Sequence, residues 1–146
     1  AYCGRKRQVG VTHEYYADLQ AMARDCDLLV VCCLATPATR SMVNADVLRA
    51  LGPKGFLVNV SRGSVIDEPA LIQALREGTI AAAGLDVCQG EPHPDPALTT
   101  LDNLVILPHL GASTTETRQA MFDVMTENLR LHFAGKPLLS PYVPDR

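Results

Sequence analysis

Phe56-Leu57-Val58-Asn59-Val60-Ser61-Arg62-Gly63 is a short apolar run that ends in a polar turn carrying an arginine. The run contains β-branched residues and is too short for a helix, so it predicts a strand. Its continuous apolar character is typical of a strand that a parallel sheet buries on both faces. The pattern therefore predicts a buried strand that delivers Arg62 just beyond its carboxyl end.

The same pattern recurs three more times, in apolar runs at residues 28–33, 80–87 and 104–107. Helical stretches lie between and after these strands. We expect helices over residues 17–24, 44–51, 70–77 and 114–133. Because strand and helix alternate, the sequence predicts an α/β fold with a mostly parallel sheet.

Capping residues set the expected helix boundaries. Asp18 is a candidate cap at the start of the first helix and Asp67 precedes the third, because short acidic residues are common N-caps. Ser113, with Glu116 three positions later, predicts a capping box for the long helix, which should end before Gly135. We expect residues 1–136 to form a partial domain and residues 137–146 to form a tail that leaves it.

The composition excludes several classes of protein. A net charge of −3 argues against general nucleic-acid binding. No apolar run approaches the roughly 20 residues of a membrane span. The five cysteines have no CxxC spacing, which favours buried, reduced thiols over a disulfide framework or a zinc site. We therefore expect a cytoplasmic protein without a metal, a membrane partner or a nucleic-acid partner.

Three chemically complementary groups follow the predicted strands in chain order. Arg62 follows the run at 56–60, Glu91 follows the run at 80–87, and His109 follows the run at 104–107. In open parallel α/β sheets, ligands bind outside the carboxyl ends of the strands. Each group alone has an ordinary explanation: a solvated arginine, a turn residue before a proline, and a hydrogen-bonded structural histidine. Their joint occurrence predicts an active site.

Together these motifs resemble the D-isomer-specific 2-hydroxyacid dehydrogenases. The resemblance is carried by Ser61-Arg62-Gly63, Gly90-Glu91-Pro92 and Pro108-His109-Leu110-Gly111, and it covers nearly the whole chain. It is closest to the glyoxylate/hydroxypyruvate reductases, because Gly4-Arg5-Lys6-Arg7 and Leu34-Ala35-Thr36-Pro37-Ala38-Thr39 follow two of the strands. The resemblance implies a Rossmann-like, doubly wound parallel sheet.

The resemblance also implies a reaction, the transfer of hydride between a nicotinamide cofactor and a small 2-keto acid to give the D-2-hydroxy acid. Arg62 would hold the substrate carboxylate through two parallel N–H bonds. His109 would donate a proton to the carbonyl oxygen, a role suited to a group that titrates near neutrality. Glu91 would accept a hydrogen bond from the other imidazole nitrogen and favour the charged ring.

Further residues are implied to contact the cofactor. They are Leu34, Thr36, Pro37, Val60, Ser61, Asp86, Gly111 and Ala112. NAD enzymes of this fold place an acidic residue after the second strand, where it binds the ribose hydroxyls. Here that position is followed by Gly4-Arg5-Lys6-Arg7, and positive charge favours a 2′-phosphate. We predict NADPH over NADH, with Arg5 and Arg7 as direct contacts and Lys6 in support.

The glycine-rich turn of a dinucleotide-binding fold, Gly-x-Gly-x-x-Gly, occurs nowhere in the sequence. The resemblance therefore implies that the first strand, this turn and a substrate domain are missing. We expect the chain to be the C-terminal part of a longer enzyme, inactive by itself, with apolar sheet faces left open.

Other functions are compatible with the same motifs. A closely related alternative is a 2-ketogluconate reductase, because the three catalytic residues do not bind the far end of the substrate and so do not distinguish these keto acids. A non-catalytic, nucleotide-sensing module of the corepressor type would carry the same set, although the basic run at 5–7 favours a reductive enzyme. A methyl donor on the same scaffold would leave the order of Arg62, Glu91 and His109 unexplained. The family also implies a homodimer, supported by the helix at 114–133.

Overall fold

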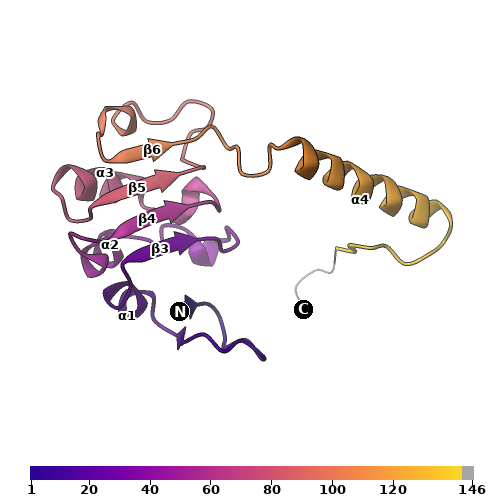
Figure 1. Ribbon diagram of the computed structural model, residues 1–146, viewed down its shortest axis with the longest axis horizontal. Coiled ribbons are helices and arrows are strands. Elements are labelled where there is room, and N and C mark those ends of the chain that lie inside the picture. Colours follow the sequence, from indigo (N-terminus) through magenta and orange to yellow (C-terminus); the bar gives the residue numbers. More distant parts are fainter. Residues whose placement is uncertain (143–146) are drawn as a thin grey trace. The chain divides into compact units, whose positions relative to one another are not determined.

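The computed structural model of this chain describes residues 1–142. Two compact units divide the chain, the first at Ala1–Pro108 and the second from His109 onward. The first unit contains the strands and three α-helices, and the second contains one long helix (Figure 1).

The larger sheet of the first unit has four parallel strands in the order β3-β4-β5-β6. The strands are β3 (Leu28–Val31), β4 (Phe56–Asn59), β5 (Ala82–Leu85) and β6 (Leu104–Ile106). Helix α1 (Leu19–Arg24) precedes β3. Helix α2 (Ala45–Leu51) connects β3 to β4, and helix α3 (Glu68–Arg76) connects β4 to β5. This order confirms the predicted α/β fold with a parallel sheet (Figure 1). All four strands are shorter than the apolar runs that predicted them.

Smaller elements complete the first unit. Strands β1 (Tyr2–Cys3) and β2 (Tyr15–Tyr16) form a separate parallel pair. Short 3₁₀ turns follow three of the strands: η1 (Pro37–Thr39), η2 (Gly63–Val65) and η3 (Leu98–Thr100), the last after the loop that follows β5.

The four-stranded sheet is apolar on both faces, and within the first unit the helices cover one of them. Leu29 and Val31 are buried in the core, whereas Leu28 and Val30 on the opposite face are 51% and 48% exposed. The core is formed with residues of the helices, such as Leu48 and Leu71. Phe56 of β4 and Val105 of β6 are also exposed, at 48% and 63%. The expectation that the strands are buried on both faces is therefore wrong for β3, β4 and β6, while the expectation of an open apolar face is confirmed.

The cysteines differ from expectation in their burial. All five are free thiols, but Cys32 and Cys33, which follow the end of β3 at Val31, are exposed. Cys3, Cys26 and Cys88 are partly buried. The expectation of buried thiols that act as small apolar side chains therefore fits the three partly buried cysteines and not the two exposed ones.

The N-caps of α1 and α3 confirm the predicted helix starts. Asp18 accepts hydrogen bonds from the N–H groups of Gln20 and Ala21, and Asp67 accepts one from Ala70. The predicted cap of α4 (Thr115–Phe133) is wrong by one residue, because Thr114 instead accepts the N–H of Thr117 at 3.1 Å.

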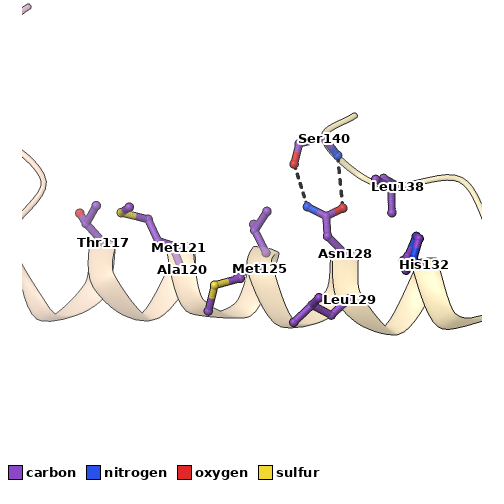
Figure 2. A pocket seen from close by; sticks show the side chains of 10 residues that line it. Thr117, Ala120, Met121, Met125, Asn128, Leu129, His132, Leu138 and Ser140 are labelled. Atoms are coloured by element: carbon purple, nitrogen blue, oxygen red, sulfur yellow. Dashed lines mark hydrogen bonds between the residues drawn. The ribbon is translucent and has the colours of Figure 1, made fainter. Parts of the chain in front are cut away.

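The second unit consists of α4 and the segment that follows it. The helix ends in a Schellman arrangement, with Gly135 at φ 65° and the Lys136 N–H donating to the Leu131 carbonyl at 2.9 Å. Asn128 then holds the following segment: its side chain accepts the Leu139 N–H and donates to Ser140 Oγ, both at 2.8 Å. Helix and segment line an apolar groove of about 740 Å³ (Figure 2).

Two remaining expectations concern boundaries and membranes. The predicted domain boundary at residue 136 stays a prediction, and residues 143–146 of the predicted tail lie outside the described residues. Within residues 1–142, no helix combines the length and the apolar character needed to cross a bilayer.

Candidate active site

A buried amide at the end of β4 shapes the turn that carries Arg62. Asn59 is fully buried; its Oδ1 accepts the Ser61 N–H at 3.0 Å, and its Nδ2 donates to the Arg62 carbonyl at 3.0 Å. Ser61 Oγ in turn donates to the carbonyl of Cys33, after β3. The backbone of Arg62 is thus fixed, while its exposed guanidinium donates to the Ser61 carbonyl at 2.6 Å.

The next strand, β5, leads into the loop that carries Glu91. The Asp86 N–H donates to the Asn59 carbonyl at 3.0 Å, so the ends of β4 and β5 are joined, and the Asp86 residue is buried. Glu91 Oε1 accepts the N–H of Cys88 at 2.8 Å, which folds the loop back on itself. The Glu91 residue is exposed.

The Arg62 turn and the Glu91 loop are packed against each other. A Cβ placed on Gly63 would lie 2.2 Å from the Cys88 carbonyl carbon, so only glycine permits this approach. Gln89 adds a hydrogen bond from its Nε2 to the Ile66 carbonyl at 3.0 Å. The structure therefore brings together the two loops that carry Arg62 and Glu91.

The third predicted catalytic residue, His109, begins the second unit three positions after the end of β6. Its φ of 55° lies in the left-handed region, which residues other than glycine seldom adopt. Gly111 and Ala112, predicted near the cofactor, belong to the same unit. The placement of these three residues beside Arg62 and Glu91 stays a prediction.

The basic run lies in a loop that two tyrosines hold. Tyr15 donates its hydroxyl hydrogen to the Gly4 carbonyl at 3.0 Å, and the Tyr2 hydroxyl oxygen accepts the Gln8 N–H at 2.8 Å. The two rings lie 5.3 Å apart between centroids. Arg5, Lys6 and Arg7 are all exposed. Sequence reasoning missed the role of both tyrosines, because their hydrogen bonds span 6 and 11 positions of sequence and leave no local pattern.

The other predicted cofactor contacts in the first unit follow β3 and β4. Leu34 is 78% exposed, and its carbonyl accepts the Thr39 hydroxyl at 2.8 Å. Thr39 Oγ1 also accepts the Thr36 N–H at 2.8 Å, and Pro37 starts η1. Val60 is exposed directly after β4. Since these strands are parallel, Leu34, Thr36, Pro37 and Val60 all follow strand ends at the same sheet edge as Arg62.

Comparison with known proteins identifies the family. Residues 1–111 match the family model described as "D-isomer specific 2-hydroxyacid dehydrogenase, NAD binding domain". The chain belongs to the D-isomer-specific 2-hydroxyacid dehydrogenases. The parallel sheet is thus the Rossmann-like sheet of the NAD-binding domain of this dehydrogenase family.

Two curated relatives of this chain are named as reductases. It is 46% identical over 143 residues to hydroxyphenylpyruvate reductase of Plectranthus scutellarioides, covering 98% of the chain and 46% of that protein. It is 42% identical over 143 residues to 2-ketogluconate reductase of Gluconobacter oxydans, covering 98% of the chain and 46% of that protein. The chain therefore spans less than half the length of these curated relatives.

A solved structure agrees with the sequence comparisons. The NADPH-dependent glyoxylate/hydroxypyruvate reductase of Sinorhizobium meliloti, in complex with NADP and malonate, superposes with a TM-score of 0.93 at 45% identity. The match covers 98% of this chain and 45% of that chain. No group of three or more histidine, cysteine, aspartate or glutamate residues within 1–142 is arranged to hold a metal ion.

Proposed function

We propose that this chain is the C-terminal part of an NADPH-preferring reductase that converts a small 2-keto acid, such as glyoxylate or hydroxypyruvate, to the D-2-hydroxy acid. The observation that carries the proposal is the packing of the Arg62 turn against the Glu91 loop, beyond the ends of adjacent parallel strands. The names of the relatives support the substrate class. As in the relatives, the complete enzyme would be about twice as long as this chain.

The proposed chemistry assigns one task to each catalytic residue. The guanidinium of Arg62 turns from the Ser61 carbonyl to the substrate carboxylate, which it holds through two parallel N–H bonds. His109 gives a proton to the carbonyl oxygen, and Glu91 orients and stabilises the charged imidazole. A bound reduced nicotinamide supplies the hydride. Asp86, Leu34, Thr36, Pro37, Val60, Ser61, Gly111 and Ala112 would line the cofactor.

The basic loop fits a phosphorylated ribose. Its three cationic side chains, Arg5, Lys6 and Arg7, are exposed. Tyr2 and Tyr15 fix the backbone of the loop that carries them. Guanidinium groups bind phosphate oxygens through paired N–H bonds. This arrangement supports NADPH over NADH as the cofactor.

Replacing Arg5 and Arg7 together by alanine is expected to raise the KM for NADPH by about 10-fold or more and to leave the KM for NADH almost unchanged, because only NADPH carries the 2′-phosphate. Initial rates of the complete enzyme with each cofactor measure this difference. Arg76→Ala, at the last residue of α3, is the matched control. Equal losses with both cofactors would contradict a phosphate contact.

Two alternatives are tested by one substrate panel. Activity of the complete enzyme is measured with glyoxylate, hydroxypyruvate and 2-ketogluconate at constant NADPH. We expect the highest kcat/KM with one of the two small acids. A preference for 2-ketogluconate would favour the function named for the Gluconobacter relative. No turnover with any substrate would favour a nucleotide-sensing module of the corepressor type.

We further propose a cytoplasmic homodimer. Helix α4 buries only Leu131 among its described residues, while Met121, Phe122, Met125 and Phe133 are exposed. An apolar helix surface of this kind is normally covered in a stable protein. The molar mass of the complete protein by sedimentation equilibrium is expected to equal two subunits.

A further inference from the structure

A buried carboxylate beside the Glu91 loop has no task in the proposed reaction. Glu68 is the first residue of α3 and is only 7% exposed. Its Oε2 accepts the backbone N–H of Gln89 at 2.8 Å, across 21 positions of sequence. Glu68 forms no ion pair within residues 1–142. A buried acidic side chain without a cationic partner is uncommon, because removing its charge from water costs free energy. Its burial therefore needs a structural or functional reason.

The hydrogen bonds of the Glu91 loop show which part of the loop Glu68 fixes in place. The bond between Glu91 and the Cys88 N–H is internal to the loop and does not anchor it to the rest of the unit. Gln89 makes two bonds that do: its N–H donates to Glu68 and its side-chain Nε2 donates to the Ile66 carbonyl. Glu68 and Ile66 lie just beyond the η2 turn, whose N-cap is Arg62.

We propose that Glu68 is a positioning residue whose carboxylate, by holding the Gln89 amide, sets the place of the Glu91 carboxylate relative to Arg62. The proposal rests on the proposed function, because it assigns Glu91 to the imidazole of the general acid. Gly63 contributes to the same arrangement, because it lets the Arg62 turn approach the backbone of Cys88 and Gln89. Any larger residue at position 63 would push Cys88 and Gln89 away.

The charge of Glu68 carries a cost in stability. Burial raises the pKa of the Glu68 carboxyl; the hydrogen bond from Gln89 lowers it and the charge of Asp95 raises it, with a net rise. A carboxyl whose folded-state pKa is above its unfolded-state pKa destabilises the fold as pH rises through that interval. Glu68→Gln is therefore expected to raise Tm at neutral pH and to change it little below pH 4.

Kinetics of the complete enzyme test the positioning role. Glu68→Ala is expected to lower kcat for keto-acid reduction by about 10- to 100-fold, the size of effect that a small misplacement of a reacting group produces. In this variant the fall of kcat at alkaline pH should begin at a lower pH, because the His109 imidazole loses the well-placed carboxylate of Glu91 that favours its charged form. Glu68→Gln should stay within about 2-fold of wild type, since the amide oxygen still accepts the Gln89 N–H.

Two further variants keep the test decisive. Glu68→Asp withdraws the carboxylate by one methylene while keeping its charge, so it should show the changes of Glu68→Ala in weaker form. Glu77→Ala is the control, because Glu77 lies at the other end of α3, is exposed, and accepts a hydrogen bond only from Gln73 among the described residues. A fall in kcat without a change in the pH profile would overturn the positioning role.

Hydrogen exchange gives a readout that does not depend on turnover. The Gln89 amide of Glu68→Ala should exchange at least about 10-fold faster than in wild type, as expected when a protecting hydrogen bond is lost. Glu68→Gln and Glu77→Ala should leave that amide unchanged. Unchanged exchange in Glu68→Ala would overturn the inference. A wild-type enzyme that reduces no keto acid would refute the proposed function, and the exchange rates would still decide whether Glu68 holds the loop.

Discussion

Replacing His109 by alanine is expected to lower kcat for keto-acid reduction by about 100-fold or more, as is usual for the loss of a proton donor. The carbonyl oxygen gains negative charge as hydride reaches the carbon, and without His109 only water can protonate it. The KM for NADPH should change little, since the proton donor does not contact the ribose phosphate. Stopped-flow or steady-state loss of absorbance at 340 nm measures both constants.

The backbone at His109 calls for a second substitution, because a φ of 55° disfavours most side chains. His109→Asn keeps a residue type that tolerates this region, so it separates loss of the acid from backbone strain. His13→Ala is the control, since His13 is exposed and has no role in the proposed reaction. Turnover of His109→Asn within about 3-fold of wild type would show that the assigned acid is wrong.

Arg62→Lys is expected to lower kcat/KM for glyoxylate by about 10- to 100-fold, although the positive charge is kept. Lysine offers a point charge where arginine offers two parallel donors to a carboxylate. Charge-assisted hydrogen bonds contribute about 1.5–3 kcal/mol each, which corresponds to this range. Most of the loss should be in the KM for the keto acid, and the KM for NADPH should stay constant.

The substitution Arg62→Lys should leave the turn that carries residue 62 unchanged. Its backbone is fixed by Asn59 and by the close approach at Gly63, neither of which involves the guanidinium. The Tm of Arg62→Lys should therefore match that of wild type. Arg49→Lys, on the exposed face of α2, is the matched control. An equal loss of affinity for NADPH and for the keto acid would contradict a carboxylate-binding role.

The sequence predicted those features that depend on local pattern. Apolar runs located all four strands of the larger sheet, and Asp18 and Asp67 located two helix starts, because caps and strand runs involve neighbouring residues. The polar residues after the strands identified the Arg62 turn and the Glu91 loop. The strand at 80–87 was predicted too long: only Ala82–Leu85 pair in the sheet, since an apolar run continues where the ladder has already ended.

Features that depend on distant partners were missed. Glu68 contacts Gln89 across 21 positions, and the tyrosines that hold the basic loop contact each other through a two-residue strand pair. Asn59 did carry a signal, because a polar residue inside an apolar strand run often has a buried hydrogen-bonding task. The open face of the sheet did not follow from the apolar runs, because a continuous apolar run alone predicts burial on both faces.

The most direct test of the proposed reaction uses the complete enzyme with hydroxypyruvate and NADPH, following absorbance at 340 nm together with chiral analysis of the product. We predict loss of one NADPH for each glycerate formed, with the glycerate in the D configuration. Binding of NADPH without its oxidation, or formation of L-glycerate, would contradict the assignment of Arg62, Glu91 and His109 to a D-2-hydroxyacid reductase.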